Sequence, residues 1–353
     1  MNLILPAEWA EQAFVQIAWP HAATDWQPYL DAAWQCYADI AREISKREDL
    51  VIVTPEPEVV EEKLKSLSDI QLQRIHLFKV ETNDTWARDN AFLTMTDEAG
   101  NKTLADFTFN GWGLKFAANL DNRINRQAFS SLKQLLDGKV SYADALHIVL
   151  EGGSVESDGK GTVLTTTSCL LAPNRNNFAS KEEAESALRN ALHCNRILWL
   201  DNSWLDGDDT DGHIDTVARF CPNDTIAYVQ CTDKEDKHFT CLNNMEKELQ
   251  QLRTPEGSAY RLIPLPMPDA IFEGDFEDAV AGEEGQRLPA TYANFLIMNG
   301  AVLMPTYGQP ENDRLAASQL QKAFPDREIV GIDCRVLIRQ HGSLHCVTMQ
   351  YPK

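Results

Sequence analysis

The sequence predicts an α/β fold in which short strands alternate with amphipathic helices. Residues 26–47 carry apolar side chains at steps of three and four, which is the spacing of one helix face. The apolar run 50–54 follows directly and is typical of a short buried strand. The same order of helix and strand recurs along the chain, and alternation of this kind is characteristic of α/β proteins.

The remaining elements follow from the same patterns. Further helices are expected near 121–136, 180–193, 235–252 and 311–323. Strands are expected at 14–19, 75–80, 91–96, 103–108, 146–150, 162–166, 216–220, 226–231, 292–298, 301–304 and 346–350. Segment 264–290 is rich in proline and acidic residues, and we expect a long surface loop there. No linker or low-complexity tract divides the chain, so we expect one domain, residues 1–353, built from several similar units.

Composition restricts the classes of partner. A chain of 353 residues with 43% hydrophobic content can bury a large core. Its formal net charge of −21 argues against nucleic-acid binding and is compatible with a small cationic substrate, although surplus carboxylates also keep proteins soluble. No apolar run reaches the ~20 residues of a membrane span, and the N-terminus does not read as a secretory signal. We expect a cytoplasmic protein with no membrane partner; the sequence leaves open whether it forms a homo-oligomer.

The cysteines suggest neither a disulfide framework nor a structural zinc site. The eight thiols lie at 36, 169, 194, 221, 231, 241, 334 and 346 without any CxxC pair or regular spacing. Most are expected to be small core residues. Cys346 differs, because it follows His345 in the stretch GSLHCVT, residues 342–348, where a buried thiol and a nucleophile are both reasonable interpretations.

Three other stretches carry more polar side chains than loops require. These are NDTWARDNAF (83–92), VLEGGSVE (149–156) and GDDTDGHIDT (207–216). Each has an ordinary interpretation: WARD as a helix cap or ion pair, EGG as a strand-to-turn ending, and the acidic stretch as a calcium loop. The calcium pattern also requires a glutamate at its twelfth position, which is Val217 when counted from Asp206.

Taken together, these stretches favour a cysteine-dependent site for a cation. His213 and Asp215 would share one face of a strand with a period of two residues. A nucleophilic cysteine needs a nearby base, and His213 can supply one. The acids exceed what such a pair requires, and carboxylates bind the forked N–H groups of a guanidinium in pairs.

The sequence resembles the agmatine deiminases, which are grouped with bacterial peptidylarginine deiminases. The resemblance extends nearly end to end and is carried by motifs in a fixed order: PAEW (6–9), AWP (18–20), DTWARD (84–89), FNGWG (109–113), EGGSVESDGKGTVLTT (151–166), APNRN (172–176), GDDTDGHID (207–215), YANF (292–295) and HCVT (345–348). It implies the pentein fold, with five ββαβ-type units around a pseudo-fivefold axis and the site at its centre. It also implies hydrolysis of a guanidine to a ureido group and ammonia through a covalent amidino-thioether.

The resemblance implies a role for each matching residue. Cys346 matches the nucleophile, His213 the general acid/base and Glu151 the acid beside that histidine. Asp89 and Asp215 match the carboxylates that hold the guanidinium. No metal or other cofactor is implied, because the nucleophile is a thiolate and the bound cation is the substrate.

Further matches concern the substrate channel. Trp86 and Asp209 match residues that line it, and Arg88 is expected to be structural. The chain departs from the usual pattern at residues 340–343, at Met349 and at residues 90–91, which concerns the distal end of the substrate. The expected reaction converts agmatine to N-carbamoylputrescine and ammonia. The alternatives are deimination of peptidyl-arginine or free arginine, amidino transfer, and guanidine or polyamine binding without catalysis.

Overall fold

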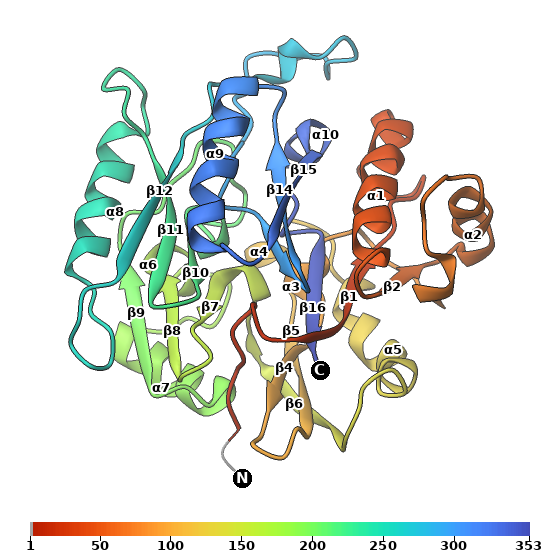
Figure 1. Cartoon of the computed structure of the whole chain (residues 1–353), viewed down its shortest axis with the longest axis horizontal. Coiled ribbons are helices and arrows are strands. Elements are labelled where there is room, and N and C mark those ends of the chain that lie inside the picture. The colour runs from red at the N-terminus through yellow and green to blue at the C-terminus, as the bar shows by residue number, and fades with distance from the viewer. Residues whose placement is uncertain (1–2) are drawn as a thin grey trace.

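Five small β-sheets form the framework of the protein. The computed structural model describes residues 3–353; four of the sheets have three strands and one has four. In each sheet two neighbouring strands run antiparallel, and a helix then leads to a strand parallel to the second. This repeated unit confirms the predicted α/β pentein architecture. Helices α1, α5, α7 and α8 lie toward the outside and short strands toward the middle (Figure 1).

The units follow one another along the chain. One unit contains β4 (Leu93–Thr96), β5 (Lys102–Thr108), α5 (Ile124–Leu132) and β6 (Val140–Val149). The next contains β7 (Val155–Ser157), β8 (Thr162–Thr166), α7 (Lys181–Leu192) and β9 (Arg196–Leu200). The third contains β10 (Ala218–Cys221), β11 (Thr225–Gln230), α8 (Phe239–Gln251) and β12 (Arg261–Pro266). The fourth contains β13 (Leu296–Met298), β14 (Ala301–Thr306), α9 (Pro310–Ala323) and β15 (Glu328–Asp333).

The remaining unit is built from both ends of the chain. Its strands are β16 (Thr348–Pro352), β1 (Gln12–Ala18), β2 (Asp49–Thr54) and β3 (Ile75–Lys79), and its helices are α1 (Leu30–Ser45) and α2 (Pro57–Lys65). β16 runs antiparallel to β1, with Thr348 opposite Ile17. Because Cys346 lies two residues before β16, this pairing fixes the position of the candidate nucleophile.

Short helical segments lie in the connections within and between the units. The one-turn helices are α3 (Ala87–Asn90), α4 (Gly111–Leu114), α6 (Thr167–Leu170) and α10 (Arg335–Ile338). The 3-10 turns are η1 (Gln27–Tyr29), η2 (Leu72–Arg74), η3 (Asp121–Arg123), η4 (Gly152–Ser154), η5 (Ile214–Thr216) and η6 (Glu273–Asp275). α3, η4 and η5 carry or adjoin the polar stretches singled out in the sequence.

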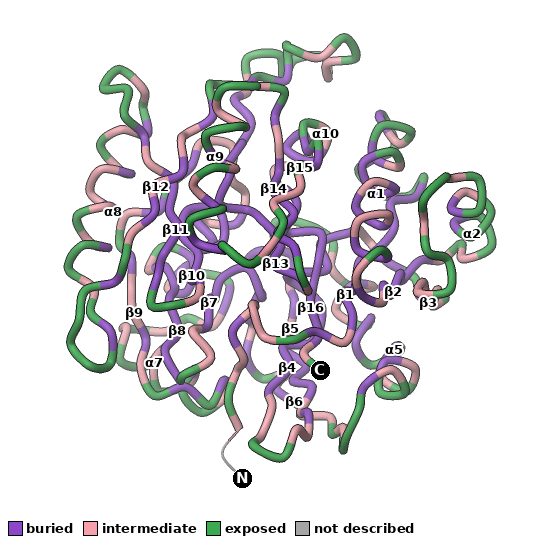
Figure 2. The backbone as a smooth tube through the Cα atoms, in the orientation of Figure 1, coloured by how far each residue is buried: buried purple, intermediate pink, exposed green. Residues whose placement is uncertain are grey.

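The core lies between the strands and their covering helices, and the exposed backbone lies at the periphery (Figure 2). In α1 the side chains of Tyr37, Ile40 and Ile44 are fully buried, whereas Asp31 and Gln35 are exposed. Burying one such apolar side chain contributes roughly 1.5–3 kcal/mol, so the spacing in α1 directly fixes which face meets the sheet. Across residues 3–353, no helix combines the length and the apolar character that a membrane span requires.

The structure confirms the five predicted helices and corrects several other expectations. Four strands, β7, β9, β12 and β15, and helix α2 were not predicted. Segment 264–290 is not wholly a surface loop, because its first three residues end β12 and residues 273–275 form η6. The predicted strand 216–220 begins only at Ala218, since Ile214–Thr216 is a 3-10 turn.

Candidate active site

The polar stretches that lie far apart in the sequence meet around Gly153. A Cβ added to this residue would lie 2.6 Å from His213 Nδ1, 2.9 Å from Asp89 Oδ1 and 3.0 Å from Asp215 Oδ2. The neighbouring Gly152 is equally constrained, because its Cβ would lie 2.1 Å from the backbone oxygen of Arg88. The EGG motif is therefore the point where η4 approaches α3 and η5 too closely for any side chain.

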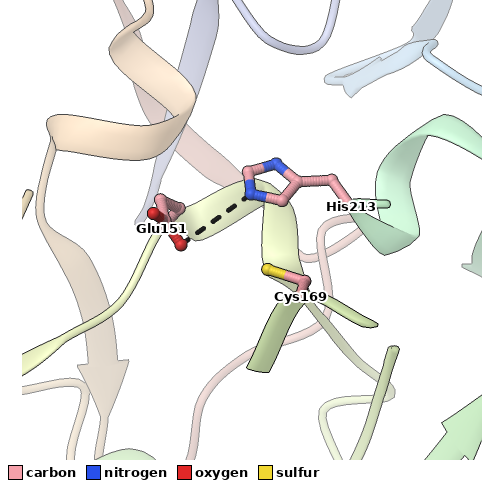
Figure 3. A group of neighbouring side chains, drawn as sticks. All are labelled: Glu151, Cys169 and His213. Carbon is pink, nitrogen blue, oxygen red and sulfur yellow. Dashed lines mark ion pairs between the residues drawn. The ribbon is translucent and has the colours of Figure 1, made fainter. Parts of the chain in front are cut away.

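His213 is wholly buried between two carboxylates. Its Nδ1 lies 3.7 Å from Asp89 Oδ1, and its Nε2 lies 3.8 Å from Glu151 Oε2, the pair drawn in Figure 3. Neither ring nitrogen has a hydrogen-bond partner among residues 3–353. Burial lowers the pKa of His213, but the charge of Asp89 and the adjacent Cys169 and Glu151 outweigh it and raise the pKa well above its ordinary value. The imidazole is thus held in its protonated form, ready to donate a proton.

Glu151 is fixed by an arginine behind it. Both carboxylate oxygens accept hydrogen bonds from Arg175 Nε at 3.0 Å, and both side chains are fully buried. Arg175 is in turn held by Asp211 Oδ2 at 2.7 Å and by the backbone oxygen of Thr210 at 2.9 Å. Burial opposes ionisation, but His213 and Arg175 lower the pKa of Glu151 below its ordinary value. Glu151 is therefore an ionised, oriented partner for His213.

Asp89 faces the pocket from α3. Its Oδ1 accepts a hydrogen bond from Gly153 N at 2.9 Å, and its Oδ2 accepts one from Trp112 Nε1 at 2.9 Å. Burial raises the pKa of Asp89 to about 6, with His213 opposing and Asp215 adding to the rise. Each oxygen keeps a second lone pair for a ligand. A bound cation would favour the ionised form of this carboxyl group.

Cys346 lies beside Asn294 and Asp215. Its Sγ is 3.4 Å from Asn294 Oδ1 and 4.0 Å from Asp215 Oδ2, and its backbone nitrogen donates to Asn294 Oδ1 at 3.2 Å. Burial, and then the charges of Asp215 and Asp89, raise the pKa of the Cys346 thiol well above its ordinary value. These effects favour the thiol form of Cys346, and a bound cation would reverse the electrostatic part of the effect.

A pocket of about 440 Å³, partly open to solvent, leads to Cys346. Its lining residues are mostly aromatic, acidic or small: Asp25, Asp84, Trp86, Asp89, Trp112, Phe116, Asp209, Thr210, Gln340, His341, Gly342 and Cys346. Trp86 meets Trp112 edge-on, with ring centroids 6.3 Å apart. Asp209 lies in a more open position, with 42% of its side chain exposed. Aromatic faces and carboxylates both attract flat organic cations.

Residues 4–352 match the family model of the Porphyromonas-type peptidyl-arginine deiminases. The chain belongs to this family. It is accordingly a hydrolase that acts on C–N bonds of amidines.

Relatives of this deiminase cover nearly its whole length. A Streptococcus mutans protein named "Putative agmatine deiminase" is 31% identical over 360 residues, covering 99% of this chain and 95% of its own. A structure described as "Putative Arginine Deiminase" from Porphyromonas gingivalis is 47% identical, with a TM-score of 0.89, covering 99% of this chain and 98% of that one. The agmatine deiminase of C. jejuni with substrate bound is 35% identical, with a TM-score of 0.87, and the match covers 99% of this chain and 96% of that one.

The structure brings most of the predicted site residues of this deiminase together. Asp89, Glu151, His213, Asp215 and Cys346 converge at the centre, although among these only Asp89 and Cys346 line the pocket itself. Trp86 and Asp209, predicted for the channel, also line the pocket.

Two parts of the sequence argument were wrong or incomplete. His213 and Asp215 do not share a strand face, because Ile214–Thr216 is a 3-10 turn; they converge through that turn. The sequence also did not show how the carboxylates of the acidic stretch are engaged: Asp208 accepts from Gly212 N at 2.7 Å, and Asp211 pairs with Lys115 at 2.7 Å.

Sequence reasoning missed three residues of the site. Asn294 and Arg175 belong to the YANF and APNRN motifs, which we used only for the resemblance, and they contact Cys346 and Glu151. Cys169 was expected to be a core thiol, but it adjoins His213 (Figure 3). A carboxylate, thiol and imidazole in this arrangement are possible metal ligands, yet both oxygens of Glu151 are already bound by Arg175.

Three of the departures from the family pattern, Gln340, His341 and Gly342, line the pocket. Gly342 packs against Trp86 so closely that a Cβ would lie 2.1 Å from the ring. His341 Nδ1 donates to the backbone oxygen of Gly207 at 2.8 Å, and Ser343 hydrogen bonds Tyr307. Arg88 faces away from this pocket and pairs with Glu8 at 3.0 Å, as expected of a structural residue.

Proposed function

We propose that this deiminase converts agmatine to N-carbamoylputrescine and ammonia through an amidino-thioether on Cys346. The observation that carries the proposal is the charge of the pocket. Within residues 3–353, the lining contains four aspartates and the nucleophile but neither lysine nor arginine. Such a pocket favours a substrate that is cationic at both ends, as agmatine is. We also propose that the chain forms a single catalytic domain. We propose a cytoplasmic location as well, because eight free thiols are typical of proteins in a reducing compartment.

The first half of the reaction forms the thioether. Asp89 and Asp215 hold the guanidinium and orient its central carbon toward Cys346. The bound cation favours loss of the thiol proton to solvent, and the thiolate adds to that carbon. The protonated His213 donates its proton to one terminal nitrogen, the C–N bond breaks, and ammonia leaves. The former guanidine carbon is then bonded to sulfur.

The second half releases the product. His213 is now neutral and takes a proton from a water molecule, which adds to the same carbon. The C–S bond breaks, the hydroxyl proton passes to the departing sulfur so that Cys346 is again a thiol, and the carbon keeps the new oxygen as a ureido carbonyl. Glu151, fixed by Arg175, keeps His213 oriented through both proton transfers.

The distal end of the substrate decides between agmatine and arginine. Free arginine carries a carboxylate there, and Asp25 and Asp209 would repel it. One observation favours arginine chemistry: a 47% identical structure is described as an arginine deiminase. Peptidyl-arginine lacks that free carboxylate, so charge alone does not discriminate against it, and the pocket is partly open to solvent.

A parallel assay of agmatine, free arginine and an arginine-containing peptide tests the proposal. Ureido product formed fastest from agmatine is the expected result, and faster turnover of arginine or the peptide contradicts it. The same incubation with an added amine detects an amidinotransferase by its guanidino product. Binding of agmatine without turnover would instead indicate a binding protein.

A further inference from the structure

His345 lies directly behind the guanidinium site without lining the pocket. Its Nδ1 is 2.7 Å from Asp215 Oδ2, and both side chains are almost completely buried. Asp215 is an acceptor here: burial opposes its ionisation, but the hydrogen bond and charge of His345 lower its pKa. The proton therefore belongs on Nδ1, which donates to Asp215.

The other ring nitrogen is held equally firmly. Burial and the charge of Arg219 lower the pKa of His345, so the ring is neutral and Nε2 accepts a hydrogen bond from Arg219 Nη2 at 2.9 Å. The two carboxylate oxygens of Glu8 lie 2.9 and 3.0 Å from Nε2, and Glu8 holds the ring through Arg219. Glu8 is itself paired with Arg88 at 3.0 Å and with Arg219. The imidazole thus bridges the N-terminal PAEW motif and the acidic stretch, which lie more than 200 residues apart in the sequence.

The bridge leaves one oxygen of Asp215 available. Oδ2 is occupied by His345, whereas Oδ1 is buried and has no hydrogen-bond partner among residues 3–353. A buried carboxylate oxygen without a donor is costly unless a ligand supplies one. The orientation of Asp215 therefore determines whether Oδ1 can accept an N–H from the substrate.

We propose that His345 is a positioning residue that, anchored by Glu8, turns Asp215 so that its free oxygen meets the amidinium group of the substrate. The inference rests on the proposed function and deepens it. It assigns to His345 and Glu8 a role in substrate geometry, carried out through Asp215 and without contact with the substrate.

A pair of histidine variants separates this role from packing. In His345→Asn the amide nitrogen takes roughly the place of Nδ1 and can still donate to Asp215. In His345→Gln it takes roughly the place of Nε2, reaching Glu8 but not Asp215. We expect kcat/KM for agmatine to fall about a hundredfold in His345→Gln and less than about tenfold in His345→Asn. The control is His76→Gln. His76 lies on β3 and forms a partly exposed ion pair with Asp49 on β2, so this variant should not change kcat/KM.

A second readout does not depend on turnover. Cys346 is alkylated with 2-chloroacetamidine, a small amidinium electrophile, and separately with neutral iodoacetamide. The ratio of the two rates measures how well the carboxylates hold an amidinium. His345→Gln should lower this ratio at least about tenfold and His345→Asn should largely restore it. If the wild type deiminates none of the three guanidines, the proposed function fails, while this ratio still tests the role of His345.

Equal ratios in the wild type and both variants would overturn the proposal. Equally low ratios in two folded variants would also overturn it, since His345 would then act only by filling space. If His345→Gln does not fold, nuclear magnetic resonance of ¹⁵N-histidine-labelled wild type decides. A proton on His345 Nδ1 that exchanges slowly with water is the expected result, and an unprotonated Nδ1 contradicts the proposal.

Discussion

The imidazole of His213 lies against the Cα of Gly153, so that a single methyl group there would approach Nδ1 to 2.6 Å. We predict that Gly153→Ala lowers kcat at least about a hundredfold, because it displaces His213, Asp89 or Asp215 from the reacting geometry. Steady-state kinetics check the loss. Gly285→Ala is the matched control, since nothing lies within 4 Å of its added Cβ. Normal activity of Gly153→Ala would mean that His213 is not confined as described.

Replacing the nucleophile should abolish turnover without unfolding the protein. Cys346→Ala removes the thiol from a buried position and changes packing little, so we expect activity below about a thousandth of wild type and a nearly unchanged melting temperature. The control Cys241→Ala alters a half-buried cysteine whose Sγ accepts a hydrogen bond from Trp204 N at 3.4 Å, and this variant should remain active. Mass spectrometry of quenched wild type should show the covalent adduct on Cys346; an adduct elsewhere would refute the assignment.

The carboxylates of the site should affect kcat as well as KM. Asp89→Asn and Asp215→Asn each remove charge-assisted hydrogen bonds to the guanidinium, on the order of 1.5–3 kcal/mol per bond. Because the same contact orients the carbon for attack, kcat should also fall. Near-normal kcat/KM in either variant would show that other acids hold the substrate. Circular dichroism verifies that both variants are folded.

Acid should weaken the reaction of the free enzyme with agmatine. Burial raises the pKa of Asp89 to about 6, so this carboxyl group is neutral below that pH and attracts a cation less. We predict that kcat/KM decreases as pH falls through about 6, since this parameter reports ionisations of the free enzyme. Asp89→Asn should remove that step from the pH profile. If the decrease near pH 6 is unchanged in Asp89→Asn, a group other than Asp89 causes it.

Substrate choice should depend on charge at the pocket mouth. We predict at least a tenfold preference for agmatine over free arginine in kcat/KM, because aspartates near the distal end repel a carboxylate. Asp209→Asn should narrow the preference by only about threefold, because Asp209 is partly exposed and screened by solvent. Asp201→Asn, in an exposed pair with Lys181, is the control. A wider preference in Asp209→Asn would contradict this account.

The buried carboxyl group of Glu48 should make the stability of the fold depend on pH. It is 5% exposed, its Oε1 has no hydrogen-bond partner among the described residues 3–353, and burial raises its pKa to about 7. Because the folded pKa exceeds the unfolded value, the native state binds more protons between about pH 4.5 and 7. Stability is therefore lost as pH rises through this window, by up to about 3 kcal/mol.

Glu48→Gln removes this ionisation and keeps an acceptor for Asn299 N. The melting temperature of the wild type should therefore fall more than that of Glu48→Gln between pH 5 and pH 8. Parallel curves for the two proteins would show that Glu48 does not titrate in this window.

The sequence predicts the elements whose burial is one-sided and regular. All five predicted helices are present, and β8 has the predicted bounds, 162–166. The missed strands are short or lie at sheet edges. β15 is only partly buried, and β12 contains Pro264 and Pro266, which an edge strand tolerates because it is paired on one side only. Neither shows the apolar pattern of a central strand.

The site shows a similar division. Cys346, His213 and the acidic residues of the site each lie in a short stretch with an unusual combination of polar residues. Such stretches can be recognised from the sequence alone. Arg175 and Asn294 act through contacts with residues 24 and 52 positions away in the sequence, and nothing in their own neighbourhoods reveals those contacts. The resemblance identified the motifs that contain Arg175 and Asn294, but only the structure identified the residues that these two side chains contact.

The pairing of β16 with β1 links the timing of folding to the onset of activity. The unit that contains β1 lacks one of its strands until β16, more than 300 residues further along the chain, has paired with it. Closing so long a loop is entropically costly and belongs to the slow class of folding events. The four other units can form from local segments beforehand. A reactive cysteine pocket therefore comes into existence only as the ring of units closes, and a partly folded chain carries its nucleophile outside any site.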